Sequence, residues 1–284
     1  MIMPDIWGLA AIITKFSLYL GVLAATGTIL VALMFRLNQF RSMALIFGGV
    51  ALIATLIGFS LKGANLTGDI SGMIDLEILV LLWSTPVGTA MALRLCGLGV
   101  LIAGLFVARG GLVLSAFGGI ISVWSFGHVG HISDVGNIVL DVALTLHLIT
   151  IAIWIGILTP LQRLATEPAT YTEAVEVGRR FGVMASITVP ALIIAGVYMS
   201  YTLVGSIAAL TQTGYGQALI IKVLLVAILL GLATANKLRF MPRLRAGDPT
   251  AANHLAKSIS IEWLVVVLVL AITAVLTSNL MLPT

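Results

Sequence analysis

Three of the four histidines lie in or beside strongly apolar stretches, where an imidazole is unusual. His128 and His131 occur three residues apart in the segment 125–131. If a helix continues through this segment, both imidazoles lie on one face, about 4.5 Å apart along the axis, and could bind one ion. A neutral imidazole is the commonest transition-metal ligand. The pattern predicts a metal site at His128, with His131 either as a second ligand or as an interfacial histidine in a glycine-rich turn.

His147 lies deeper, about ten residues into the next apolar stretch and thus roughly 15 Å below its end. This depth predicts a functional ligand, and a structural hydrogen bond to a neighbouring helix is the alternative. His128 and His147 differ in depth by roughly 10 Å. Such an offset suits two successive metal stations better than two ligands of one ion. Trp154 falls on the same helix face as His147, and we expect it to pack.

Methionine supplies a second kind of candidate ligand, because a thioether is soft and matches Cu(I). Met1 and Met3 form a Met-x-Met pair at the start of the chain, where core packing does not explain them. Cys96 is the single cysteine, so the chain has no internal disulfide and no paired-cysteine metal site. Soft-metal binding would therefore depend on histidine and methionine.

Four charged residues fall inside apolar stretches, where each costs about 2.5–3.5 kcal/mol on insertion scales. We expect structural ion pairs to explain all four. Lys15 and Arg94 could pair with Asp141 or with the acidic connection that follows residue 62. The other two residues, Lys222 and Glu262, are each placed about one turn from opposite faces of the membrane, so a direct pair between them is not expected.

The elements that position these residues are apolar helices. A composition of 60% hydrophobic and 9% charged residues, with a mean hydropathy of +1.16, excludes a water-soluble globule. The runs are long enough to cross a hydrocarbon core about 30 Å thick. They predict an all-α, polytopic membrane bundle that forms one domain over residues 1–284. The eight predicted spans are Leu9–Phe35, Met43–Leu61, Val87–Ala108, Leu112–His128, Ile138–Leu158, Gly182–Val204, Gln217–Ala235 and Ser258–Leu280.

The segments between the spans are also predictable. Residues 75–83 are apolar but too short to span, which indicates an interfacial or re-entrant helix. Residues 159–180 and 236–257 contain prolines and charges and are expected to be short solvated connectors. Eleven of the fifteen Lys and Arg residues fall on one side of this topology. Since positive residues near helix ends stay cytoplasmic, both termini are predicted to lie outside.

Several short motifs resemble the copper resistance protein D family of bacterial inner-membrane proteins. Their order and spacing carry the resemblance, which is strongest over residues 112–280. The motifs are Gly127-His128-Val129, Leu146-His147-Leu148, Ile153-Trp154-Ile155-Gly156, Arg180-Phe181, Tyr215-Gly216, Leu219 to Lys222, Asn236 to Arg239 with Pro242, and Ser260-Ile261-Glu262. The resemblance implies copper handling at the cytoplasmic membrane, with His128 and His147 as preferred ligands. It implies no role for His131, Met1 or Met3.

Three functions remain open at this point. The first is a non-enzymatic permease or relay that passes Cu(I) or Cu(II) through histidine and methionine sites, with a periplasmic copper-binding chaperone as its partner. The second is a b-type haem redox protein, because histidines on adjacent helices also hold haem. The third is a membrane anchor that docks the chaperone. The basic residues do not cluster on a solvated domain, so beyond the lipid bilayer we expect no nucleic-acid partner.

Overall fold

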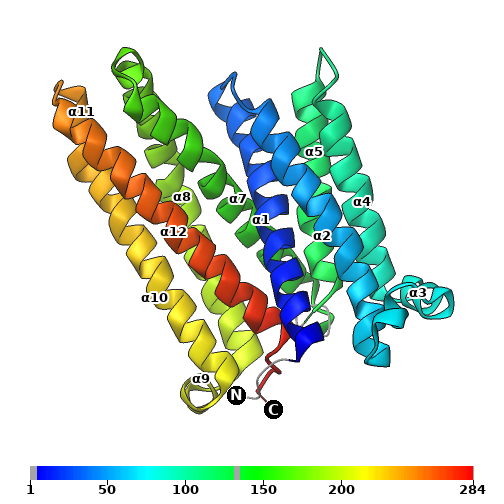
Figure 1. Cartoon of the computed structure of the whole chain (residues 1–284). Coiled ribbons are helices and arrows are strands. Elements are labelled where there is room, and N and C mark those ends of the chain that lie inside the picture. Colours follow the sequence, from blue (N-terminus) through cyan, green and yellow to red (C-terminus); the bar gives the residue numbers. More distant parts are fainter. Residues whose placement is uncertain (1–4, 131–134, 284) are drawn as a thin grey trace.

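The computed structural model describes residues 5–130 and 135–283, and within these ranges its regular elements are all helices. Eight helices are long and apolar enough to cross a membrane, as the hydropathy pattern predicts. The all-α polytopic bundle is therefore confirmed (Figure 1). The long helices are α1 (Ile6–Phe35), α2 (Arg41–Thr67), α4 (Pro86–Gly104), α5 (Gly111–Trp124), α7 (Ile138–Thr166), α8 (Tyr171–Val204), α10 (Gly214–Ala235) and α12 (Pro249–Ser278).

Short helical elements join or extend these long helices. They are the 3-10 turns η1 (Ile70–Met73), η2 (Ser125–His128) and η3 (Pro168–Thr170), the helices α3 (Leu76–Trp83), α9 (Ile207–Gln212) and α11 (Met241–Arg245), and the π-helical turn η4 (Asn236–Phe240). Helix α3 confirms the short helix predicted over residues 75–83. Asp75 caps it by accepting from the backbone N–H groups of Glu77 and Ile78.

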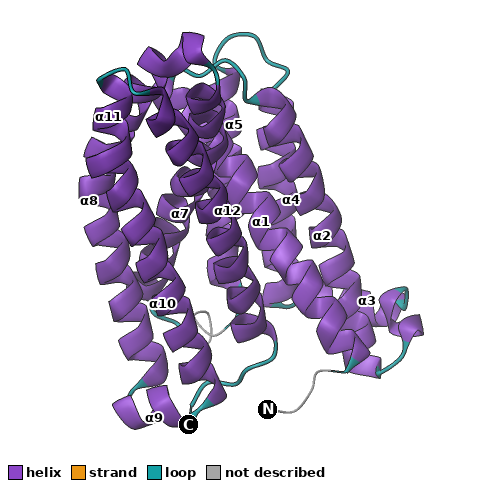
Figure 2. Cartoon of the chain, turned by 60° about the vertical axis from the view of Figure 1, so that its left-hand side comes forward, coloured by secondary structure: helices purple, strands orange, loops and turns teal. Residues whose placement is uncertain are grey.

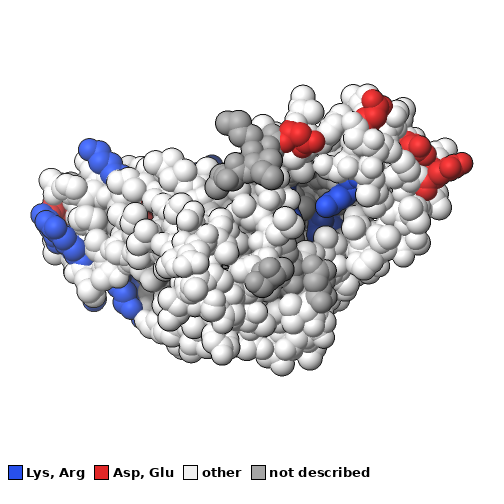
Figure 3. All heavy atoms as spheres, turned by 90° about the horizontal axis from the view of Figure 1, so that it is seen from below, with Lys and Arg blue, Asp and Glu red and all other residues white. Residues whose placement is uncertain are grey.

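The start of α1 and the end of α12 lie at the same end of the bundle, together with α3 and α9, while α11 lies at the opposite end (Figure 1). We call these the terminal end and the basic end. Exposed acidic residues gather over one edge of the terminal end, where α3 lies (Figure 3); Asp69, Asp75 and Glu77 belong to that region. The basic end holds the connections, and the turns beside them, that carry Arg36, Arg41, Arg109, Arg163, Arg179, Arg180, Lys237, Arg239, Arg243, Arg245 and Lys257.

Helix α1 lies at the centre of the bundle. It packs against α2 and α5 on one side and against α7 and α12 on the other, so it joins the first four long helices to the last four (Figures 1 and 2). Of its most apolar window, 83% is buried, compared with 6% for α8 and none for α10. Helices α8 and α10 are therefore less enclosed by their neighbours than the other long helices.

Two helix backbones approach closely where α1 crosses α7. A Cβ atom added at Gly27 would overlap the carbonyl oxygen of Ala152, and one added at Gly156 would overlap the backbone of Gly27. Small residues at such a crossing let two helix backbones meet, and in a membrane this packing replaces the hydrophobic driving force. The central helix is thereby held against the helix that carries His147.

The two predicted connectors are wrong in detail, because most of their residues are helical. Helix α7 continues to Thr166, α8 begins at Tyr171, and residues 236–245 extend α10. Helix α12 begins at Pro249, the first-turn position that proline favours. Asp248 caps it and accepts from the hydroxyl and backbone N–H of Thr250, which lowers the pKa of this carboxyl. Polar turns extend these helices beyond the apolar stretches, where hydropathy carries no signal.

Candidate functional site

His147 lies nine residues into α7, on the face that meets α8. A Cβ atom added at Gly196 of α8 would lie 3.6 Å from its Cε1 atom, and the backbone of Leu192 is within hydrogen-bonding reach. Lys222 of α10 is close enough to interact electrostatically. The Nδ1 atom is buried and has no hydrogen-bond partner among the described residues. His147 therefore contacts α8, and its Nδ1 atom is left without a hydrogen-bond partner in the described part of the chain.

His128 is the last residue of η2, at the terminal end of the bundle. Its ring makes an edge contact with Trp124, with centroids 6.2 Å apart, and its Nδ1 atom is also buried without a partner among residues 5–130 and 135–283. A Cβ atom added at the neighbouring Gly127 would lie 3.4 Å from Oδ1 of Asp141, an oxygen that is likewise unpartnered. Two unsatisfied ligand atoms, an imidazole nitrogen and a carboxylate oxygen, thus occur in the same region.

The helix that would place His128 and His131 on one face does not continue past His128. The helix ends at His128, because Val129 is extended and Gly130 has a φ of 105°. His131 itself lies outside the described residues, as do Met1 and Met3, so these three candidate ligands stay predictions. In the described ranges, no three His, Cys, Asp or Glu side chains come together to form a metal site.

The charged residues inside the bundle do not form the ion pairs that we expected. Lys15 donates to the backbone carbonyl of Thr277 at 2.6 Å, a group in the last turn of α12 that no later N–H of the helix can reach. Arg94 donates to the hydroxyl of Ser125 at 2.8 Å and lies 4.8 Å from the ring of Phe126. Within residues 5–130 and 135–283 the ion pairs are Arg179–Glu176 and Arg243–Asp248. Neutral acceptors and an aromatic face therefore hold these two cations.

A polar cluster that the sequence did not reveal surrounds Glu262. The indole N–H of Trp154 donates to Oε2 of Glu262 at 3.2 Å, and Nδ2 of Asn236 donates to Oε1 at 2.5 Å. The Trp154 ring also makes an edge contact with Phe181, with centroids 6.1 Å apart. Trp154 therefore does more than pack. Because a buried indole N–H usually finds an acceptor, Trp154 was the residue from which a polar partner could have been predicted.

Glu262 lies further from the start of its helix than the predicted span indicated. Helix α12 begins nine residues before the predicted span, so Glu262 lies thirteen residues from its start, or about 20 Å along the axis. Trp154 lies twelve residues before the last residue of α7, which is at the same end of the bundle as the start of α12, so the two side chains lie at a matching depth. The pair is therefore placed well inside the bundle, and Asn236 reaches it from the end of α10.

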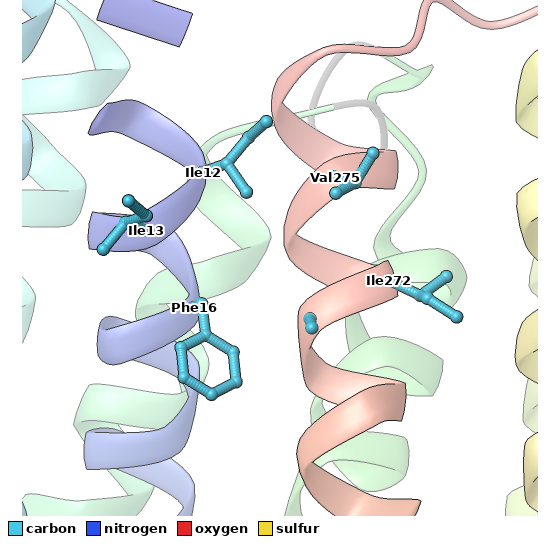
Figure 4. A pocket seen from close by; sticks show the side chains of 6 residues that line it. Ile12, Ile13, Phe16, Ile272 and Val275 are labelled. Atoms are coloured by element: carbon cyan, nitrogen blue, oxygen red, sulfur yellow. The ribbon is translucent and has the colours of Figure 1, made fainter. Parts of the chain in front are cut away.

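The pocket drawn in Figure 4 lies between α1 and α12 and is no metal site. The residues that line it carry only hydrocarbon side chains, so they offer neither a ligand atom nor a charge. They are Ile12, Ile13, Phe16, Ala271, Ile272 and Val275.

Two family models match the chain. The model described as "Copper resistance protein D-like, N-terminal domain" matches residues 3–139, which include His128, and "Copper resistance protein D" matches residues 175–276, which include Asn236 and Glu262. No curated protein and no solved structure matches the chain.

Proposed function

This chain belongs to the copper resistance protein D family, and we propose that it relays or translocates copper ions across the membrane through histidine sites. Family membership makes it a copper-handling, multi-pass membrane protein. We propose the bacterial cytoplasmic membrane as its location and transport, not an enzymatic reaction, as its activity. The basic end would then lie in the cytoplasm and the terminal end outside.

The observation that carries this proposal is the unpartnered Nδ1 atom of His147. A polar atom buried without a hydrogen bond costs free energy, so its persistence well inside an apolar bundle calls for a ligand. A neutral imidazole nitrogen is a good ligand for copper. The similar free nitrogen of His128 lies at the terminal end, where an ion would enter. We propose His128 as the outer station and His147 as the inner one.

Weaker ligands would collect the ion before it reaches His128. We propose that Met1, Met3 and His131 contribute thioether and imidazole groups at the terminal end, which a periplasmic copper-binding chaperone would supply with copper. Conduction requires sites that bind an ion and still release it to the next one. A few weak ligands meet this requirement better than a closed coordination shell.

The two other candidate functions have less support. Bis-histidine haem ligation needs both imidazoles at one iron, whereas His128 ends η2 at the terminal end and His147 lies nine residues into α7. A pure anchor for a chaperone needs no buried histidine with a free nitrogen. Loss of His147 would therefore leave an anchor intact but disable a relay.

Metal analysis of the purified chain tests the proposal. We expect copper to bind in about stoichiometric amounts, with no haem absorption band, because soft metal ions match the free imidazoles and thioethers. Metal content per chain and the absorption spectrum are measured on the same sample. Stoichiometric iron with a Soret band would instead establish the haem protein, and a chain that binds neither metal would leave only the anchor.

The proposed orientation is tested by a reporter fusion. A reporter enzyme that is active only in the cytoplasm is expected to be silent when it is fused after Thr284 and active when it is inserted after Gly247, in the turn before α12. The reason is the concentration of Lys and Arg at the basic end. Reporter activity measured in whole cells decides the question. Activity after Thr284 with silence at Gly247 would invert the bundle and place His128 on the cytoplasmic side.

A further inference from the structure

Glu262 is a carboxylic residue buried inside the last four long helices. Only 3% of the surface of Glu262 is exposed, and both of its carboxyl oxygens have a hydrogen-bond partner. Both partners, the indole of Trp154 and the amide of Asn236, are neutral. A buried carboxylate normally requires a cation or a metal ion, because neutral donors repay only part of the lost hydration.

No cation contacts Glu262 in the described part of the chain. Helix α12 packs against α1, α7, α10, η4 and α11. Lys237 of η4 donates instead to the carbonyl of Gly182 and the hydroxyl of Ser186, at 3.0 and 2.9 Å. The other ionisable side chains on these elements and on α12 itself are Lys15, Tyr19, Asp141, His147, Arg163, Tyr215, Lys222, Arg239, Arg243, Arg245, His254 and Lys257.

The geometry around Glu262 suits a proton and not a metal ion. The N–H groups of Trp154 and Asn236 point at the carboxyl oxygens, whereas a bound cation would need lone pairs to converge on it. Burial without a neighbouring cation favours protonation of the carboxyl group itself, although the two N–H donors alone favour the carboxylate.

Asn236 can serve both charge states of Glu262. Its amide donates from Nδ2 to a carboxylate, and after a flip it accepts at Oδ1 from a carboxylic acid. In the present orientation Oδ1 of Asn236 is buried and has no hydrogen-bond partner in the part of the chain that the structure describes. Asn236 also begins the π-helical turn η4, a local distortion that is frequent at functional sites.

Polar groups continue from Glu262 toward the basic end. Ser258 lies one helical turn away on the same face of α12, and its hydroxyl is buried without a partner in the described ranges. Beyond Ser258 toward that end, the carbonyl of Ala256 accepts from the amide of Gln162 at 3.3 Å; the same amide donates at 2.7 Å to the hydroxyl of Ser260, which lies between Ser258 and Glu262 along α12. These groups mark a route by which a proton can reach water at the basic end.

We propose that Glu262 is a proton-binding site, protonated at rest, that loses its proton toward the basic end when a copper cation occupies His147. This coupling depends on the proposed function, whereas the resting proton does not. His147 and Trp154 share one face of α7, seven residues or roughly 10 Å apart, which places the cation near the carboxyl group. The O–H bond of the carboxylic acid breaks, the proton leaves by way of Ser258, and the carboxylate balances the charge of Cu(I).

Infrared spectroscopy of the purified full chain tests the resting state. In the copper-free protein we expect the carbonyl stretch of a buried carboxylic acid, shifted in D₂O and lost at alkaline pH. The band should be absent in Glu262→Gln and unchanged in Glu167→Gln, which removes an exposed carboxyl group. Trp154→Phe should move the band without removing it, because this variant deletes one hydrogen bond and keeps the acid. A wild-type spectrum without the band, or a band that survives Glu262→Gln, would overturn the proposal.

Addition of Cu(I), with redox-inert Ag(I) in parallel, tests the coupling. We expect the band to diminish as the metal binds, with about one proton released per ion into a weakly buffered solution. In Glu262→Gln, metal should still bind but proton release should be lost. Metal binding with no change in the band would overturn the coupling while the relay function stands. A chain that binds no metal but shows the pH-dependent band would remove the relay function and the coupling, and would leave the proton site in place.

Discussion

Replacing His147 with alanine is expected to reduce copper transport by at least about tenfold, the effect of losing roughly 1.4 kcal/mol or more of metal binding. His147 is the histidine of α7, so the variant removes the unpartnered nitrogen that would hold the ion. Gly196 and Leu192, which lie next to His147 on α8, have no side-chain atom that could replace the imidazole as a ligand. Uptake of copper into proteoliposomes is the measurement, with folded protein quantified in the same preparation.

His254 provides the matched control. It is exposed near the start of α12 and stacks on Phe240, with ring centroids 5.7 Å apart. His254→Ala should leave transport within about twofold of the wild-type chain, since its surroundings explain it as a surface residue. If His254→Ala and His147→Ala reduced transport equally, or if neither did, the inner histidine station would have to be abandoned.

Replacing Gly27 with alanine is expected to prevent normal folding, although it adds a single methyl group. The new Cβ would occupy the position of the Ala152 carbonyl oxygen, so α1 and α7 would have to separate along their whole crossing. Well-packed interiors cannot absorb such a shift, and we expect a loss of about 3 kcal/mol or more in unfolding free energy. Thermal unfolding in detergent and the amount of folded protein in the membrane are the measurements.

Gly49 is the corresponding control in α2, because an added Cβ there meets nothing within 4 Å. Gly49→Ala should be neutral or slightly stabilising, since alanine favours a helix by about 1 kcal/mol over glycine. Gly156→Ala, on the α7 side of the crossing, should be nearly as harmful as Gly27→Ala. Normal folding of both crossing variants would show that α1 and α7 do not meet at these two glycines.

Much of the fold followed from hydropathy. A segment of about twenty apolar residues must be helical in a bilayer, because no water is present to satisfy its backbone groups. That constraint accounts for the eight spans, and the short apolar run before Trp83 accounts for α3. Hydropathy did not predict the helical turns that extend beyond the apolar stretches. The polar residues around Asp248 and Thr250 begin a helix because of the Asp248 cap and the position of Pro249. Neither feature changes the mean hydropathy of a segment.

The candidate ligands were visible in the same way, since an imidazole within an apolar stretch stands out from its neighbours. Their surroundings were not visible. The sequence offered opposite charges as partners for Lys15 and Arg94, but the fold gives them the carbonyl of Thr277 and the hydroxyl of Ser125. A free backbone carbonyl or a hydroxyl on another helix is too common a group to identify from sequence.

Residues far apart in the chain form the cluster at Glu262, and no local pattern connects them. Trp154 and Asn236 precede Glu262 by 108 and 26 positions. Their meeting depends on where α7, α10 and α12 begin and how they cross. Residue types and apolar length can be determined from the sequence because the bilayer acts on each segment separately. Which polar groups satisfy one another depends on the crossing of helices, because a hydrogen bond is made over about 3 Å and a one-residue error in a helix start rotates a side chain by about 100°.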